Sequence, residues 1–317
     1  MGLKHLVWPL AVAVLVVYVL QEDESVDPGP LTCGGQAPVL GGKVVVVTGG
    51  CRGLGYQLAL EVARRGARLV LACRDSGPGR AARQRILAAT ASERVSVIGL
   101  EMSRMKHVST FVYNLKQKYD RVDVLINNAA ISGEEERRET VEGLEVVMAT
   151  NYLGPLHLTQ SLAPVMAQDG VVINLVDRGG VDPVTPDLEY LNSSERYDPA
   201  SVYLQSKRLL QLMTREMSAE VSPSVYSVEP CPVWTGLHSS LPHLVTSWLV
   251  RVLGPLLGPA PVREGGRTVV WLAGGGAGGR ESGRLWHSCR LEEEDGQEVP
   301  QELRRISEEL IQRALTS

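Results

Sequence analysis

The sequence contains a single phenylalanine, and aromatic residues make up only 5% of the chain. Its hydrophobic core must therefore be built from Val, Leu, Ile and Ala, which suits strands that are buried on both faces of a sheet. Long basic runs are also missing, and 36 aspartates and glutamates outnumber 32 lysines and arginines, for a net charge of −4. This charge balance argues against nucleic acid as a partner.

Cysteine motifs are missing as well. None of the five cysteines has the CxxC spacing, and no cysteine–histidine cluster has the spacing of zinc ligands. The sequence therefore predicts no metal site. We interpret the five cysteines as free thiols: Cys33, Cys51, Cys73, Cys231 and Cys289.

The longest uncharged run near the N-terminus is short for a membrane span. Leu6–Leu20 follows Lys4 and His5 and would rise about 22 Å as a helix, against roughly 30 Å for a bilayer core. With the two basic side chains reaching the interface, the run could just span or half-insert. We predict a membrane anchor over residues 1–20 and a Pro/Gly-rich linker over 21–42. A signal peptide, and hence a secreted protein, is the alternative, although no small-x-small cleavage site follows Leu20.

From Lys43 onward, short β-branched runs alternate with amphipathic helical patterns. Strands that alternate with helices predict parallel βαβ units with helices on both faces of the sheet. We expect a single domain over residues 43–317 with a doubly wound parallel sheet of the Rossmann type. The predicted strands are 44–47, 68–72, 95–98, 122–126, 171–176 and 224–228, and the predicted helices are 54–62, 80–89, 108–118, 142–167, 201–221 and 302–315.

One apolar segment, Leu237–Pro261, breaks this alternation and is interrupted by Pro and Gly. It could cover a nonpolar substrate or touch a membrane, or it could simply pack as a helical excursion on the core.

A glycine-rich segment, Thr48–Gly55, lies between the first predicted strand and the first predicted helix. Glycines let the backbone turn tightly and approach a pyrophosphate, and the N–H groups at the helix start bind the anion. The position of the segment in a strand–turn–helix unit predicts a dinucleotide site. The residues that we expect to hold the cofactor there are Gly49, Arg52, Gly53, Leu54 and Gly55.

Two arginines favour a particular dinucleotide. An acidic residue at the end of the second strand would bind the ribose 2′-hydroxyl, but Arg74 occupies that region here. Arg52 adds a second positive charge near the adenosine ribose. Guanidinium groups bind phosphates well, so we predict NADP(H) over NAD(H).

Tyr203 and Lys207 lie four residues apart in a predicted helix, so both project from one helix face. A free tyrosine has a pKa near 10 and is a poor base at neutral pH. A neighbouring ammonium group stabilises the phenolate and lowers that pKa. The pair therefore predicts acid–base chemistry.

These motifs together resemble those of the short-chain dehydrogenase/reductase family, whose fingerprints are Thr-Gly-x-x-x-Gly-x-Gly and Tyr-x-x-x-Lys. The segments Arg64–Asp75, Leu191–Ser193 and Ser282–Trp286 resemble its retinol dehydrogenase-like branch, and the resemblance covers about residues 40–315. It implies that the lysine binds the nicotinamide ribose. It further implies site roles for Asn128 after the fourth strand, for Asn151 as the holder of a water near the lysine, and for Thr235 in a segment that closes on the nicotinamide.

Four positions depart from the family pattern. Asp177 stands where the resemblance implies a serine that hydrogen-bonds the substrate oxygen, so we count it among the catalytic residues. An ionised carboxylate there would repel an alkoxide and raise the tyrosine pKa, whereas a protonated one could donate a hydrogen bond. Glu101 stands where the family usually has an adenine-contacting aspartate. Ala130 and Cys231 each replace a glycine.

The resemblance implies an NADP(H)-dependent oxidoreductase that interconverts a lipophilic alcohol and its carbonyl, such as a retinoid or a steroid. A catalytically impaired, cofactor-binding pseudoenzyme that acts as a membrane-associated binding protein is the alternative. We expect association with the endoplasmic reticulum membrane, and the family resemblance also implies a homodimer through the helices around Glu142 and Ser201.

The membrane face stays open. Lys4 before the apolar run and the sequon Asn192-Ser193-Ser194 favour a lumenal body, whereas free cysteines favour the cytosolic face.

Overall fold

The computed structural model describes residues 33–34, 38–74, 76–90, 92–177, 197–230, 264–278, 281–293 and 301–317. The predicted anchor, most of the predicted linker, the apolar segment Leu237–Pro261 and the sequon at Asn192 lie outside these ranges. Within them, no helix combines the length and the apolar character needed to cross a bilayer.

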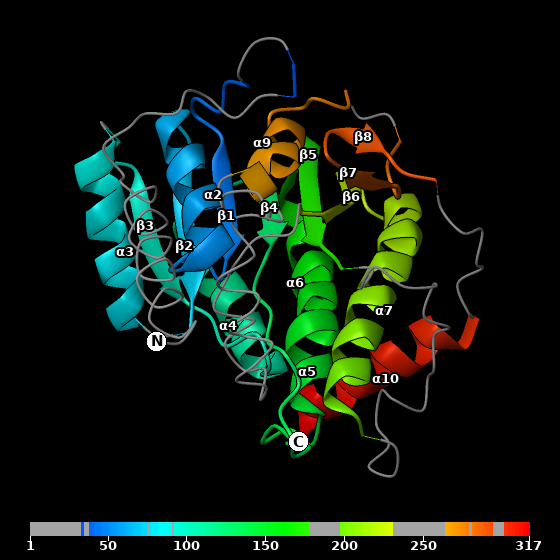
Figure 1. The fold of residues 1–317 in the computed structure, drawn as a ribbon. Helices are drawn as coiled ribbons and strands as arrows, with labels where there is room; N and C mark the ends of the chain where they lie inside the picture. Colours follow the sequence, from blue (N-terminus) through cyan, green and yellow to red (C-terminus); the bar gives the residue numbers. More distant parts are fainter. Residues whose placement is uncertain are drawn as a thin grey trace, which may run out of the picture.

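The described residues form one sheet in the strand order β3-β2-β1-β4-β5-β6-β7-β8 (Figure 1). Neighbouring strands from β3 to β7 are parallel, and only β8 is antiparallel to its neighbour. The strands are β1 (Val44–Thr48), β2 (Arg68–Cys73), β3 (Val95–Gly99), β4 (Val122–Asn127), β5 (Met166–Leu175), β6 (Ser224–Glu229), β7 (Leu285–His287) and β8 (Arg290–Leu291). The predicted Rossmann-type sheet is confirmed.

Helices cover both faces of the sheet, and each face has its own apolar core (Figure 1). One face is covered by α2 (Gly53–Arg64), α3 (Ser76–Ala89) and α9 (Arg267–Ala273), and the other by α4 (Met105–Lys116), α6 (Gly154–Leu162) and α7 (Pro199–Glu220). Every residue of β1 and of β4 is buried, as expected for strands between two helical layers.

The predicted helix over residues 142–167 is wrong in its bounds. It is replaced by α5 (Val146–Met148), a π-helical turn η1 (Ala149–Leu153), α6, and a 3₁₀ turn η2 (Ala163–Val165), after which β5 begins at Met166. The sequence places two prolines in this range that are expected to disturb a helix, and they explain the breaks: Pro155 lies in the first turn of α6, and Pro164 lies in η2. Proline lacks the N–H that a continuous α-helix needs.

A short helix, η5 (Glu264–Gly266), leads into α9, and α10 (Gln301–Thr316) closes the described chain. The buried face of α10 is formed by Leu303, Ser307, Leu310, Ile311 and Ala314. Ser307 hydrogen-bonds the buried hydroxyl of Tyr152 at 2.7 Å, and Arg304 pairs with Glu220 at the end of α7. The predicted terminal helix docks on the core as expected.

The interpretation of the cysteines as free thiols is wrong for four of the five. Cys33 is bonded to Cys289, and Cys51 is bonded to Cys73, with Cα–Cα distances of 5.5 and 6.5 Å, respectively. Both distances lie in the range that a disulfide spans. The pairs are 256 and 22 residues apart in sequence, so nothing in their spacing indicated them.

Candidate active site

The strand order reverses between β1 and β4, because β2 and β3 extend from one side of β1 and β5 from the far side of β4. In open α/β sheets, ligands bind at such a switch point, beyond the carboxyl ends of the strands. The loop after β1, the residues after β4 and the end of β5 all meet at this edge. The sequence-predicted site residues that the structure describes are carried by these segments, by the residues after β2 and β3, by η1 and by α7.

The phosphate loop has the backbone that its glycines were expected to permit. Gly49 and Gly53 have positive φ angles of 66° and 54°. A Cβ on Gly55 would lie 2.3 Å from the carbonyl oxygen of Gly49 and 2.4 Å from the amide nitrogen of Asn128. Only glycine fits this close approach of loop and helix.

The start of α2 is suited to an anion. Its N-cap residue, Arg52, makes no side-chain hydrogen bond to the first turn. The Leu54 side chain is buried in the core, so only its backbone can face a ligand. Uncapped N–H groups at a helix start carry the partial positive charge that binds a phosphate. The local structure therefore fits a dinucleotide.

Asn128 fixes the loop in place. Its side-chain amide donates to the carbonyl oxygen of Thr48 at 2.8 Å and to that of Gly49 at 3.4 Å. The Thr48 hydroxyl in turn accepts from the backbone N–H groups of Asn128 and Ala129, each at 3.0 Å. Asn128 thus positions the phosphate loop, and its predicted contact with the cofactor stays a prediction. The role of Thr48, the first residue of the glycine motif, was not predicted.

The two arginines that are predicted to bind a 2′-phosphate follow β1 and β2. Arg74 is 75% exposed and its Nε lies 3.7 Å from Oε2 of Glu101, so two of the predicted cofactor residues form an ion pair. The disulfide between Cys51 and Cys73 joins the chain immediately before Arg52 to the chain immediately before Arg74. The two arginines are thereby held on segments that are covalently linked.

Tyr203 and Asp177 are in direct contact. The Tyr203 hydroxyl, on α7, donates to Oδ2 of Asp177 at 3.1 Å. Burial of Tyr203, followed by the charge and the hydrogen bond of Asp177, raises the pKa of the tyrosine well above its ordinary value of 10. The expectation that a carboxylate here would disfavour the phenolate agrees with this geometry.

Lys207 lies one helical turn after Tyr203 and is buried. Its Nζ donates to the carbonyl oxygen of Leu175, the last residue of β5, at 2.9 Å. Burial lowers the pKa of Lys207 to about 8, and Asp177 opposes the shift by favouring the ammonium form. The lysine is therefore held at the sheet end and close to a change of charge near neutral pH.

Asn151 lies in the π-helical turn η1 and is fully buried. Its side chain accepts from the backbone N–H of Ile131 at 2.9 Å and donates to the Ile131 carbonyl at 2.8 Å. It also donates to the Ser206 hydroxyl at 3.1 Å. Asn151 therefore ties the segment after β4 to α7, one residue before Lys207. Sequence reasoning gave no role to Ser206, although it lies within the Tyr-x-x-x-Lys motif.

Thr235 and Cys231 lie outside the described residues, so their predicted site roles stay predictions. Among the described residues, no group of three or more His, Cys, Asp or Glu side chains could hold a metal ion.

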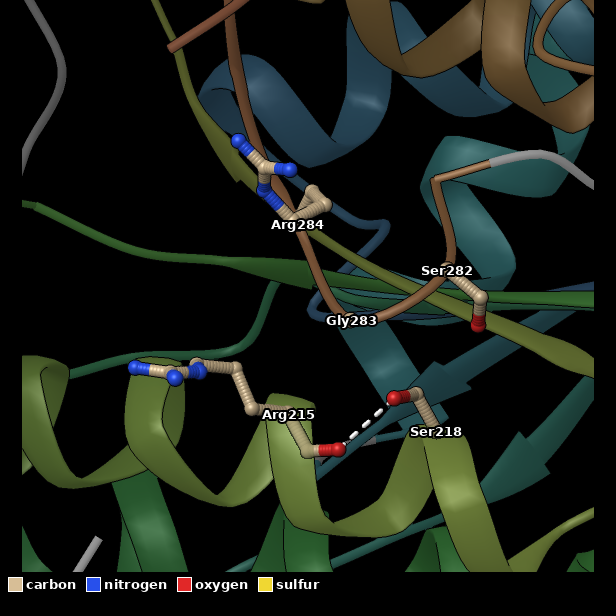
Figure 2. Close-up of a pocket in the computed structure, with 5 residues that line it drawn as sticks. All are labelled: Arg215, Ser218, Ser282, Gly283 and Arg284. Carbon is tan, nitrogen blue, oxygen red and sulfur yellow. Dashed lines mark hydrogen bonds between the residues drawn. The ribbon is translucent and has the colours of Figure 1, made fainter. Parts of the chain in front are cut away.

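A hollow of about 320 Å³ lies elsewhere, between α7 and the turn before β7 (Figure 2). Arg215, Ser218, Ser282, Gly283 and Arg284 line it. The Ser218 hydroxyl donates to the Arg215 carbonyl (Figure 2). The Ser282 hydroxyl accepts from the backbone N–H of Val225. Arg215 is twelve residues beyond Tyr203, about 18 Å along a helix. This hollow is therefore separate from the candidate active site.

The fold and the site define a dinucleotide-binding oxidoreductase. A family model described as short chain dehydrogenase matches residues 43–243, and the chain belongs to this family.

The relatives agree with the expected branch. Dehydrogenase/reductase SDR family member 13 of Homo sapiens is 31% identical over 290 residues, which cover 88% of this chain and 74% of that protein. Retinol dehydrogenase 13 of Mus musculus is 34% identical over 201 residues, 62% of this chain and 60% of that one. A solved protein of Mycobacterium paratuberculosis superposes with a TM-score of 0.65 at 25% identity, and the match covers 90% and 98% of the two chains. The chain is thus a retinol dehydrogenase-like member of the family, and nicotinamide-dependent alcohol and carbonyl chemistry is the activity of its class.

Proposed function

We propose that the protein is an NADP(H)-dependent oxidoreductase that interconverts a lipophilic alcohol and its carbonyl, with a retinoid-like or steroid-like substrate. The observation that carries the proposal is the placement of Tyr203 and Lys207 on one face of α7, within reach of the end of β5. A bound nicotinamide would supply the hydride acceptor or donor. The chain would bind the dinucleotide, orient the substrate oxygen and move its proton.

The choice of NADP(H) rests on Arg52 and Arg74. β2 carries no carboxylate and is followed by Arg74, and Glu101 reaches Arg74 from beyond β3. A 2′-phosphate placed between the arginines would gain two charge-assisted contacts.

A titration with each nucleotide tests this proposal. Full-length protein in detergent is titrated with NADPH and with NADH, and the nucleotide fluorescence is followed. Selective binding of NADPH, followed by turnover of at least one lipophilic carbonyl or alcohol from a panel, is the expected result. Failure to bind either nucleotide would refute the oxidoreductase and leave a fold retained for another partner.

The alternative is a pseudoenzyme that binds the cofactor without turnover. The contact between Tyr203 and Asp177 favours it, because a carboxylate beside the tyrosine opposes formation of the phenolate. NADPH binding without turnover of any member of the panel, in wild type and in Asp177→Ser alike, would select this alternative.

We further propose that residues 1–20 anchor the protein in the endoplasmic reticulum membrane, with the body on the lumenal side. Disulfides persist in oxidising compartments such as the lumen of the endoplasmic reticulum. Because Cys33 is bonded to Cys289 and Cys51 to Cys73, these cysteines support the lumenal side instead of the cytosolic side that free thiols would favour. Lys4 and the sequon at Asn192 favour the same side. On a gel of protein from cells, we expect a glycosylated band that a glycosidase removes and that the Asn192→Gln variant lacks. If the wild type shows no such band and both cysteine pairs are reduced in cells, the body lies in the cytosol.

The homodimer stays a proposal. The resemblance places the dimer interface on two helical segments: the one from α5 to α6, and α7. α10 contacts both of them, because Ser307 hydrogen-bonds Tyr152 and Arg304 pairs with Glu220 at the end of α7. A dimer built on these segments would therefore include α10 in its interface. Sedimentation of the protein with and without Gln312→Arg, a substitution on the exposed face of α10, measures this contribution.

A further inference from the structure

Asp177 changes what the position after β5 can do. A serine hydroxyl both donates and accepts hydrogen bonds, whereas an ionised carboxylate only accepts them. Here the carboxylate accepts a hydrogen bond from the Tyr203 hydroxyl, with 3.1 Å between the two oxygens. Asp177 therefore offers a proton acceptor within hydrogen-bond distance of the Tyr203 hydroxyl, and a substrate oxygen bound beside Tyr203 would lie close to it.

Tyr203 is poorly placed to lose its proton. Burial and Asp177 both raise its pKa. The cation that would stabilise a phenolate, Lys207, is bound to the carbonyl oxygen of Leu175 and has a pKa lowered to about 8. As the pH rises toward the value at which a phenol ionises, Lys207 loses its positive charge. It then no longer stabilises the phenolate form of Tyr203.

We propose that Asp177 is the proton acceptor when the site oxidises an alcohol, and that Tyr203 stays protonated and donates a hydrogen bond to the substrate oxygen. The two residues thus exchange the roles that the family pattern gives to this tyrosine and to the serine. The inference rests on the proposed oxidoreductase function.

The proton and the electrons balance in this scheme. The substrate O–H bond breaks and its proton passes to an Asp177 oxygen, forming a carboxyl group. The C–H bond breaks and its electron pair leaves with the hydrogen as a hydride to the oxidised nicotinamide, so the alcohol becomes a carbonyl. Asp177 then returns its proton to solvent, and Tyr203 keeps its own throughout.

The exchange also selects the form of the substrate. An ionised Asp177 attracts the hydroxyl proton of an alcohol and repels the lone pairs of a carbonyl oxygen. The site therefore binds lipophilic alcohols in preference to the matching carbonyls when Asp177 is ionised, and reduction needs the protonated carboxyl. Two titratable groups on α7, Tyr203 and Lys207, interact with Asp177.

The kinetic test compares Asp177→Asn, Asp177→Ser and Tyr203→Phe in oxidation with NADP⁺, using retinol and a hydroxysteroid as probes. Asp177→Asn keeps the shape and removes the base, so kcat is expected to fall by about 10²–10⁴-fold. Tyr203→Phe is expected to lose less. In Asp177→Ser, the tyrosine must act as the base, so the increase of kcat/KM with pH is expected to occur at higher pH than in the wild type. The double variant Asp177→Ser/Tyr203→Phe should then have no oxidation activity. The proposal would be overturned if Tyr203→Phe had no detectable kcat while Asp177→Asn kept a kcat close to that of the wild type.

A second measurement does not depend on turnover. Protein labelled with ¹³C at the tyrosine Cζ is titrated by NMR, and Tyr203 is assigned from the signal missing in Tyr203→Phe. We expect Tyr203 to remain protonated to about pH 11 in the wild type and to ionise at lower pH in Asp177→Asn. Ionisation of wild-type Tyr203 near neutral pH would overturn the exchange even if the enzyme is active. Absence of nucleotide binding refutes the proposed function instead, so the two failures are distinguishable.

Discussion

Cys51 and Cys73 are bonded to each other, and each of them directly precedes an arginine. The bond links the phosphate loop to the end of β2, and the backbone N–H of Gly49 also donates to the carbonyl oxygen of Ala72 in β2 at 2.9 Å. It therefore fixes the separation of the backbone at Arg52 and Arg74. The pocket proposed for the 2′-phosphate is preorganised by a covalent link.

Removing this bond should weaken cofactor binding. In Cys51→Ser/Cys73→Ser, we expect a loss of about 3 kcal/mol of stability, since a bond closing a loop of this size constrains the unfolded chain. We also expect at least a several-fold weaker affinity for NADPH, measured by nucleotide fluorescence. The matched control is Cys33→Ser/Cys289→Ser, which removes the bond at the turn beside α9. It should lower stability and leave NADPH affinity unchanged; equal losses of affinity in both pairs would contradict the local role.

The two arginines should discriminate between nucleotides. Arg74→Ala and Arg52→Ala each remove one charged contact to a 2′-phosphate, so the Kd of NADPH should rise about tenfold or more in each. The Kd of NADH should change little. Parallel titrations with both nucleotides give the ratio directly. An equal effect on both would mean that the arginines bind the pyrophosphate rather than the 2′-phosphate.

Gly55 should tolerate no side chain. A Cβ there would lie 2.3 Å from the Gly49 carbonyl oxygen, so Gly55→Ala must displace the phosphate loop from α2. We expect a loss of about 1–3 kcal/mol of stability and loss of nucleotide binding. Gly99→Ala at the end of β3 is the control, because a Cβ there meets nothing within 4 Å. Thermal melts and a nucleotide titration of the two variants test the contrast.

Lys207 should make stability depend on pH above neutrality. Its pKa falls from 10.5 to about 8 on folding, so between these values the unfolded chain binds a proton that the folded protein does not. Stability should therefore rise with pH across that window, by about 3 kcal/mol, and the cost of burying the charged lysine should be fully present below pH 8. In Lys207→Met, this rise should be lost. Urea unfolding at a series of pH values measures it, and an unchanged slope in the variant would assign the dependence to other groups.

Much of the fold was predictable because it depends on local patterns. The runs Val44–Val47 in β1 and Val124–Ile126 in β4 are continuous and apolar, and both strands were recognised almost residue by residue. β7 and β8 have three and two residues, too few for any periodicity to show. The Tyr203–Lys207 pair was found because its spacing of four residues is itself a contact on a helix.

The rest of the site depends on contacts between distant segments. The disulfide partners are set by Cα separations after folding, which scattered cysteines do not reveal. Asn151 bonds Ile131 and Ser206 from a π-helical turn, and the extra residue in that turn has no sequence signature of its own. The direct bond of Tyr203 to Asp177 likewise required the geometry of the end of β5.

The antiparallel strand β8 has one more consequence. An exposed sheet edge invites pairing with another chain, and a long edge strand would favour aggregation of the protein. Here the last strand at this edge is only Arg290–Leu291, runs against its neighbour, and begins directly after a cysteine that is bonded to Cys33. An incoming strand would find two residues to pair with and a positive charge on one of them. We conclude that this side of the sheet is protected from edge-to-edge assembly by its shortness and charge.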